Sequence, residues 1–183
     1  MDPMQRELEE VAAAIRSELR LEAEEAEREA ALSAAMRRSL SDVVGELMAH
    51  GDTVALDVGE QTFTGAITGV GSDLVTMDAA GGRVDVHLGS LVSVRVVKRA
   101  CAGGVRGAPR GPTGLRARLL ELQLSGQEVE AGIDGAAEPV HGPVALVGSD
   151  HVAIGEKGGP EWFLPFTALT YVRARPSRTS GRL

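Results

Sequence analysis

The spacing of apolar residues along the chain first predicts a long helix. Residues 4–38 contain no Gly or Pro, and Leu8, Val11, Ile15 and Leu19 follow one another at steps of three or four. This spacing places them on one face of a helix. Glu and Arg dominate the rest of its surface, and the face narrows to alanine after Leu19. We predict an acidic helix over residues 1–38, with two interpretations: a solvated helix that packs by its narrow face, or a coiled coil.

A second, shorter helix is predicted before the pattern changes to alternation. Ser39 and Asp42 resemble a capping box, and His50-Gly51 supplies a stop. After Gly51, apolar and polar residues alternate over five short stretches, which are separated by Gly, Asp and Ser turns. These stretches lie near 54–58, 63–69, 74–77, 84–88 and 91–96. Five short strands in about fifty residues predict an antiparallel meander that forms a closed or nearly closed barrel.

The second half of the chain repeats the first half. Leu40, Leu47 and Gly51 return 75 residues later, as Leu115, Leu122 and Gly126. Gly65 and the turn Gly71-Ser72-Asp73 return 77 residues later, as Gly142 and Gly148-Ser149-Asp150. Leu91, Val94 and Arg95 return 78 residues later, as Leu169, Val172 and Arg173. The offset grows only where loops are expected, which is typical of a duplicated fold.

The repeat leads to a fold class and a set of boundaries. We predict a mainly β protein with some helix: two tandem five-stranded small barrels, each preceded by a short helix, plus the long N-terminal helix. Residues 101–114 are rich in Gly and Pro, as linkers are. The predicted parts are the helix 1–38, the first barrel 39–98, the linker 99–114, the second barrel 115–175 and a basic tail 176–183.

Both repeats resemble the Sm-like family, which includes Sm, LSm and bacterial Hfq proteins. The resemblance is carried by Gly51-Asp-Thr-Val-Ala-Leu56, Thr64-Gly-Ala-Ile-Thr-Gly-Val70, Leu74-Val-Thr-Met77 and Leu91-Val-Ser-Val94. It covers about 40–97 and 115–175, and it implies small Sm-like or SH3-like barrels that join by their strand edges into rings and bind RNA. The whole chain also resembles actinobacterial proteins with an acidic N-terminal helix and two such modules, which implies a bacterial source.

The family's RNA-contacting residues have no counterpart here. Its base-contacting Asn would fall at Val75 or Met77 in the first repeat, and at Val152 or Ile154 in the second. The Arg-Gly pair of its second motif is missing around 87–91, as is the Tyr-Lys-His signature of Hfq. The resemblance in fold therefore does not bring the RNA site with it.

The distribution of charge along the chain still allows RNA binding. The net charge of −7 and pI near 5.1 argue against bulk affinity for nucleic acid. The stretch 98–118, however, holds six basic residues and no acidic one. These candidate phosphate contacts are Lys98, Arg99, Arg106, Arg110, Arg116 and Arg118, with Arg173, Arg175, Arg178 and Arg182 near the C-terminus. Such contacts would bind the backbone without selecting bases.

Two further groups are candidate sites. Most of the aromatic residues fall in one predicted strand, as Trp162, Phe163 and Phe166. They are interpreted either as packing at the end of a barrel or as an exposed interaction patch. The Gly-Ser-Asp turns at 71–73 and 148–150 are interpreted as local turn chemistry, in which the side chains bond their own backbone.

The sequence offers no catalytic constellation, so we expect no enzyme, no cofactor and no small-molecule substrate. The single cysteine, Cys101, excludes an internal disulfide and a cysteine zinc site, and the four histidines lack metal-ligand spacing. The chain has no apolar run long enough to span a bilayer and no signal-peptide core near Met1, so we expect a cytoplasmic protein without membrane contact.

Two functions remain. The first is a non-catalytic interaction or oligomerisation module that acts as adaptor or scaffold, with a protein partner or a second copy. The second is an RNA-binding Sm-like protein that uses the arginines of the linker and tail. The missing base-contacting residues and the acidic total favour the first.

Overall fold

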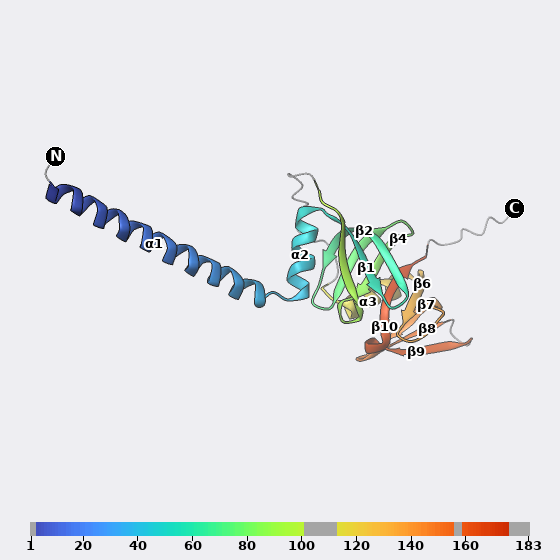
Figure 1. The fold of residues 1–183 in the computed structure, drawn as a ribbon. Helices are drawn as coiled ribbons and strands as arrows, with labels where there is room; N and C mark the ends of the chain where they lie inside the picture. The colour runs from blue at the N-terminus through green and yellow to red at the C-terminus, as the bar shows by residue number, and fades with distance from the viewer. Residues whose placement is uncertain (1–2, 101–112, 156–158, 176–183) are drawn as a thin grey trace. The chain divides into compact units, whose positions relative to one another are not determined.

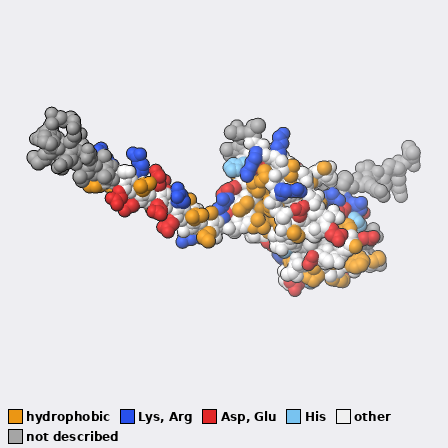
Figure 2. All heavy atoms as spheres, in the orientation of Figure 1, with side chains coloured by type: hydrophobic (Ala, Val, Ile, Leu, Met, Phe, Trp, Pro, Cys, Tyr) orange, Lys and Arg blue, Asp and Glu red, His pale blue; other side chains and the backbone are white. Residues whose placement is uncertain are grey.

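The computed structural model describes residues 3–100, 113–155 and 159–175, and it separates the chain into the units 1–39 and 40–183. The first unit is the helix α1, Pro3–Met36 (Figure 1). Acidic, basic and apolar side chains are interspersed along its surface (Figure 2). From Ile15 to Met36 every side chain is exposed, the apolar ones included. The long helix is therefore confirmed, while the coiled coil stays a prediction.

Among its described residues, the second unit contains two α-helices, two short 3-10 helices and ten strands (Figure 1). The α-helices are α2 (Leu40–His50) and α3 (Leu115–Ser125). Their ends are set by Gly51 and Gly126, whose positive φ angles of 75° and 63° suit glycine. The strands of the first repeat are β1 (Thr53–Val58), β2 (Gln61–Val70), β3 (Leu74–Ala79), β4 (Gly82–His87) and β5 (Ser93–Lys98). Those of the second are β6 (Glu128–Ile133), β7 (Val140–Val147), β8 (His151–Gly155), β9 (Glu161–Pro165) and β10 (Leu169–Ala174).

All ten strands form one antiparallel sheet, so the prediction of two separate five-stranded barrels is wrong. The strand order is β5-β1-β2-β3-β4-β10-β6-β7-β8-β9. The first repeat does not close into a barrel, because β4, at one end of its five strands, pairs with β10 of the second repeat and not with β5. An edge strand presents unpaired N–H and C=O groups, and another strand satisfies them at little cost. The coarser prediction, a mainly β fold with helices, is confirmed.

The strand registers repeat at the same offsets as the sequence. Val54 pairs with Gly65 in the first repeat, and Val129 pairs with Gly142 in the second. Val129 lies 75 positions after Val54, and Gly142 lies 77 positions after Gly65. These are the offsets of the sequence repeat. We call two residues counterparts when they occupy equivalent places in the two repeats.

The buried apolar residues form two clusters, and each cluster contains one residue from the other repeat. The cluster under α2 and the strands of the first repeat includes Tyr171 of β10. The cluster under α3 and the strands of the second repeat includes Leu74 of β3. The β4–β10 pairing is thus accompanied by an exchange of core side chains. The described residues of the unit 40–183 form one compact body that includes this junction.

Candidate interaction surface

The junction between the repeats is a two-strand contact with a buried charge pair. Tyr171 and Val172 of β10 face Val86 and Asp85 of β4. Asp85 is fully buried, and its carboxylate accepts a hydrogen bond from the Thr76 hydroxyl at 2.7 Å. The Arg118 Nε of α3 donates to the second carboxylate oxygen at 2.6 Å. Burial alone would lower the pKa of Arg118, but the Asp85 carboxylate raises it above its ordinary value.

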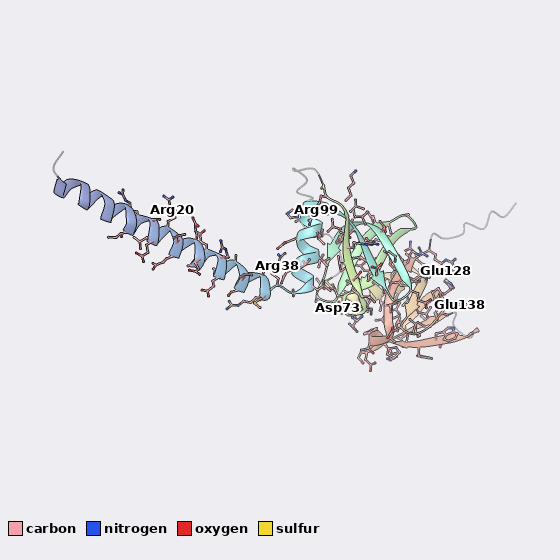
Figure 3. All side chains as sticks on the ribbon, viewed as in Figure 1. Arg20, Arg38, Asp73, Arg99, Glu128 and Glu138 are labelled. Carbon is pink, nitrogen blue, oxygen red and sulfur yellow. The ribbon has the colours of Figure 1, made fainter. Side chains whose placement is uncertain are left out.

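A turn of the first repeat caps the helix of the second. The Leu115 N–H at the start of α3 donates to Asp73 Oδ1 at 2.9 Å. Asp73 is labelled in Figure 3. The N–H and the hydroxyl of Ser72 both donate to the Thr113 carbonyl, at 2.8 and 3.0 Å. A Cβ on Gly71 would lie 2.6 Å from that oxygen, so the close approach requires glycine here. The interpretation as local turn chemistry missed this contact, because the partners lie about forty residues away.

Tyr171 joins the junction to a buried carboxylate. Its ring meets Phe63 edge-on, with 4.9 Å between centroids, and its hydroxyl donates to Glu130 at 3.0 Å. The Arg173 guanidinium donates to both oxygens of Glu130, at 2.8 and 2.9 Å. Burial and Glu130 raise the pKa of Tyr171 to about 12. Burial alone would raise the pKa of Glu130, but Arg173 and Tyr171 hold it below its ordinary value.

The two outermost strands of the sheet carry exposed apolar side chains. Within the described residues, β5 pairs only with β1, and β9 pairs only with β8. On β9, Trp162 is 56% exposed and Phe163 61%. Phe166 is half-buried and packs against the core of the second repeat. The three predicted aromatics therefore divide into two exposed side chains on an edge strand and one packing residue.

The second Gly-Ser-Asp turn has the same internal geometry as the first, but it caps no helix within the described residues. The Gly148 N–H donates to the His151 carbonyl, as the Gly71 N–H does to Leu74. Asp150 is largely exposed, and its Oδ1 lies 2.8 Å from the His151 Nδ1. This contact lowers the pKa of Asp150. Because its geometry is maintained without a helix to cap, the turn is preformed.

Several of the predicted phosphate contacts have partners within the chain. Arg99 pairs with Asp52 at 2.9 Å, and Arg116 donates to the Gly148 carbonyl at 3.1 Å. The pKa of Asp52 is lowered by the Ala100 N–H and by Arg99. Arg118 is engaged by Asp85, and Lys98 is exposed on β5. Arg106, Arg110, Arg178 and Arg182 lie outside the described residues.

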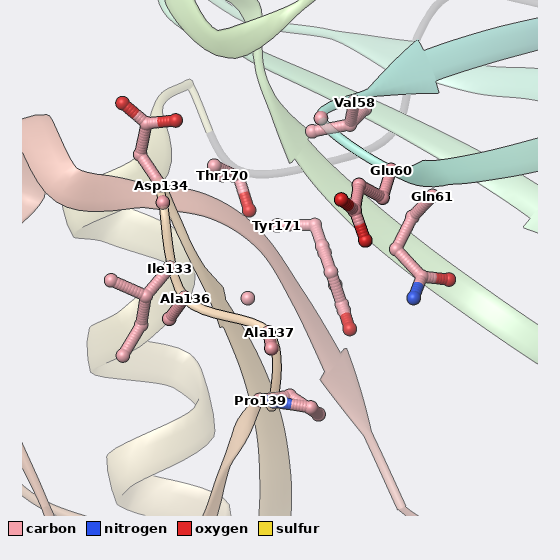
Figure 4. Close-up of a pocket in the computed structure, with 13 residues that line it drawn as sticks. Val58, Glu60, Gln61, Ile133, Asp134, Ala136, Ala137, Pro139, Thr170 and Tyr171 are labelled. Carbon is pink, nitrogen blue, oxygen red and sulfur yellow. The ribbon is translucent and has the colours of Figure 1, made fainter.

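A pocket of about 340 Å³ lies beside the junction, at a place to which no sequence pattern pointed. The β1–β2 turn forms one wall and residues 132–139 the other (Figure 4). Glu60 and Gln61 stand on the first wall, and the Tyr171 ring lies between the walls (Figure 4). The described part of the chain contains no group of three or more His, Cys, Asp or Glu that could hold a metal ion. The polar groups of the pocket include the carboxylates of Glu60 and Asp134, which accept hydrogen bonds.

No protein-family model and no curated protein matches the sequence. Among the described residues, none of the helices combines the length and apolar character needed to cross a membrane. Within the described residues, the second unit has a paired junction between its repeats and two edge strands with exposed apolar side chains.

Proposed function

We propose that the protein is a non-catalytic, Sm-like interaction module that joins protein chains through the edges of its sheet. The observation that carries the proposal is β9, an edge strand whose Trp162 and Phe163 side chains are both more than half exposed. Exposed edges with apolar side chains are liabilities that proteins normally cover or charge. Large exposed aromatics together with unpaired backbone groups suit the addition of a strand from a partner.

A photo-crosslinking experiment tests this proposal. A photo-reactive phenylalanine analogue is placed at position 163 of the full chain and, as matched control, at Leu124, which is 88% exposed on α3. Irradiation in the cell should give a defined protein adduct at position 163 and little at position 124. The same diffuse labelling at both positions would contradict the proposal.

RNA binding remains a second proposal, supported by the basic composition of 98–118. Arg116 and Arg118 have structural partners, so their substitution would disturb the fold as well as any phosphate contact. The better test replaces Arg106 and Arg110 by Gln and measures RNA binding at low and physiological salt. Phosphate-led binding should weaken steeply with salt and with this double substitution. Binding that survives both, with preference for a short sequence, would indicate a base-reading pocket.

A further inference from the structure

We propose that the pocket beside the junction binds a small organic cation, in which an ammonium group is carried on a short apolar chain. The ammonium group would donate hydrogen bonds to the Glu60 carboxylate and to the Thr170 hydroxyl oxygen. The described lining of the pocket includes no residue of β9. The proposal is therefore independent of the proposed contact through the edge of the sheet.

The Thr170 hydroxyl is the observation that points to a ligand. Thr170 is only 7% exposed, and its hydroxyl has no hydrogen-bond partner among the described residues. Every fully enclosed side-chain oxygen or nitrogen in the described part of the chain does have a partner, so this hydroxyl must open into the pocket that Thr170 lines. Figure 4 shows it directed into the space between the two walls. Because buried hydroxyls normally have a partner, a ligand group fits at this point.

A β-bulge explains the direction of this hydroxyl. From Leu169 to Tyr171, β10 advances by two residues while its partner β6 advances by one. Thr170 is therefore the extra residue of the bulge. Bulges re-aim a side chain and are over-represented beside active sites. The bulge thus gives Thr170 an orientation that regular pairing would not.

The first repeat has a polar cluster at the equivalent place, and the cluster satisfies itself. The Asp57 carboxylate accepts hydrogen bonds from the Thr62 and Ser93 hydroxyls. The counterparts of these three residues all line the pocket: Gly132, Pro139 and Tyr171. Conversely, the counterpart of Thr170 is Val92, which has no hydroxyl to satisfy. The unpartnered hydroxyl is thus specific to the second repeat.

Gly132 allows this wall of the pocket to form. A Cβ at this position would lie 2.2 Å from the Tyr171 ring and 2.6 Å from the Thr170 hydroxyl oxygen. Glycine therefore lets the ring and the hydroxyl approach the β6 backbone together. The side chain of its counterpart, Asp57, could not be accommodated here. The wall is thus built by the same change of residue that removes the internal carboxylate.

Charge selects a cation as the ligand. The described lining contains the carboxylates of Glu60 and Asp134 and no Lys, Arg or His. The Glu60 carboxylate extends toward the Tyr171 ring, between the walls, whereas the Asp134 carboxylate points away from that space (Figure 4). Glu60 is thus the contacting charge, and Asp134 adds to the negative potential around the opening. An ammonium group has three donors and no acceptor, which suits a carboxylate and a hydroxyl oxygen.

The size and the apolar part of the pocket favour a short chain on the cation. The volume of about 340 Å³ lies near the lower end of the range typical of small-molecule sites, about 300–1,000 Å³. The apolar lining includes Val58, Ala136, Ala137 and Pro139. These residues would cover an alkyl chain of a few carbons, while its ammonium group lies beside Glu60 and Thr170.

The first experiment titrates the full, nitrogen-15-labelled chain with butylammonium and follows the backbone amides by NMR. The shifts should be concentrated in residues 58–61 and 132–137. Butylammonium should bind about tenfold tighter than butanol, which has the same chain without the charge, and acetate should not bind. Equal binding of butylammonium and butanol, or shifts only outside these two segments, would overturn the proposal.

A matched pair of variants tests the charged contact. Glu60→Gln keeps the shape of the side chain and should weaken butylammonium binding about tenfold, because the contacting charge is lost. Glu138 is exposed on the 132–139 wall but is not among the described lining residues (Figure 3). Glu138→Gln should therefore weaken binding by less than about twofold. Equal losses would mean that the ligand responds only to overall charge, and would overturn the assigned contact.

Thr170→Val tests the hydroxyl by placing there the residue type of the first repeat. Butylammonium binding should weaken about threefold to fivefold, as the loss of one hydrogen bond predicts. Because the hydroxyl has no partner among the described residues, the melting temperature of this variant without ligand should stay the same or rise. A lower melting temperature, or unchanged binding, would overturn the role assigned to this hydroxyl.

Two sources could supply the ammonium group: a free amine or a lysine side chain of a polypeptide. Both carry it on the same four-carbon chain, so butylammonium is compared with a blocked pentapeptide that has one lysine among glycines. Equal or tighter binding of butylammonium assigns the pocket to a free amine. Tighter binding of the peptide assigns it to a lysine side chain. Failure of both probes to bind overturns the proposal and leaves the crosslinking result at position 163 unaffected.

Discussion

The two repeats share strand order and register but bury different side chains at equivalent places. Glu130 of the second repeat is buried and bonded to Arg173 and Tyr171. The counterparts in the first repeat are Ala55, Arg95 and Ser93, of which the last two are exposed. A repeat in sequence therefore sets the backbone of both halves, while the neighbouring strands decide which side chains are removed from water.

The position of a strand in the sheet explains this difference. β10 lies between β4 and β6, so its side chains have a neighbouring strand on each side within the sheet. β5 has only β1 beside it among the described strands. Tyr171 and Thr170 of β10 are buried, whereas Ser93 of β5 and the preceding Val92 are exposed. The difference leads to predictions that can be ordered by the size of their effect.

The largest effect is expected where the internal junction buries its charge pair. Asp85→Ala removes the buried carboxylate from Arg118, which is only 12% exposed, and leaves it the half-exposed Glu121 carboxylate at 2.9 Å. We expect a loss of about 3–5 kcal/mol in the free energy of unfolding, measured by urea denaturation. Asp85→Ala combined with Arg118→Ala should cost less than the sum of the single changes. Additive losses would show that the two residues do not act as a pair.

A smaller loss is expected at the buried carboxylate that the first repeat lacks. Glu130→Gln removes the charge that Arg173 and Tyr171 contact, at a cost of about 1.5–3 kcal/mol at neutral pH. The pKa of Glu130 is lowered in the folded protein, so its contribution is present above pH 4.5 and is lost as pH falls through the folded value. The difference in unfolding free energy between wild type and variant should therefore shrink in acid.

The same substitution can be followed by spectroscopy, since Tyr171 is the sole tyrosine. Phenolate absorbance of the native protein should report a pKa of about 12, and Glu130→Gln should lower it. Because the folded pKa is raised above the ordinary value of 10, the stability that the neutral phenol contributes should fall between about pH 10 and 12. A native titration at the ordinary value would contradict the burial of this hydroxyl.

The two Gly-Ser-Asp turns offer the next comparison. A Cβ on Gly71 would meet the Thr113 carbonyl at 2.6 Å, and this backbone atom belongs to the capped helix start. Gly71→Ala should cost about 1–3 kcal/mol in unfolding free energy. A Cβ on Gly148 would meet the His151 ring, a side chain that can turn away, so Gly148→Ala should cost much less. Equal costs would mean that the helix contact does not constrain the first turn.

The smallest effect is expected from removing the helix α1. Every side chain of residues 15–36 is exposed, and the unit 40–183 packs by itself. Deletion of residues 1–36 should leave the cooperative unfolding of the sheet within about 0.5 kcal/mol of wild type. An aggregated or molten product would show that α1 completes a core.

Local elements of the fold could be predicted closely from the sequence. The helix over 40–50 and its stop at Gly51 follow from apolar spacing and from the freedom of glycine at positive φ. The strands follow from alternation, although Leu88, which was expected at the end of a strand, begins the 3-10 turn Leu88–Ser90. The exposed pair on β9 was one of two interpretations of the aromatic cluster, and composition alone could not choose between them.

What the sequence by itself determined about this protein is the repeat and its elements, because residues close in the chain set periodicity, caps and turns. Only the tertiary structure decided that β4 pairs with β10, that Asp73 caps a helix 42 positions away, and that Arg118 neutralises Asp85. The strand pairing depends on backbone edges, which every strand possesses regardless of its side chains, and the two side-chain contacts join residues that are far apart in the chain. The choice of neighbour for an edge is therefore made by the packing of the whole sheet and leaves little trace in local sequence.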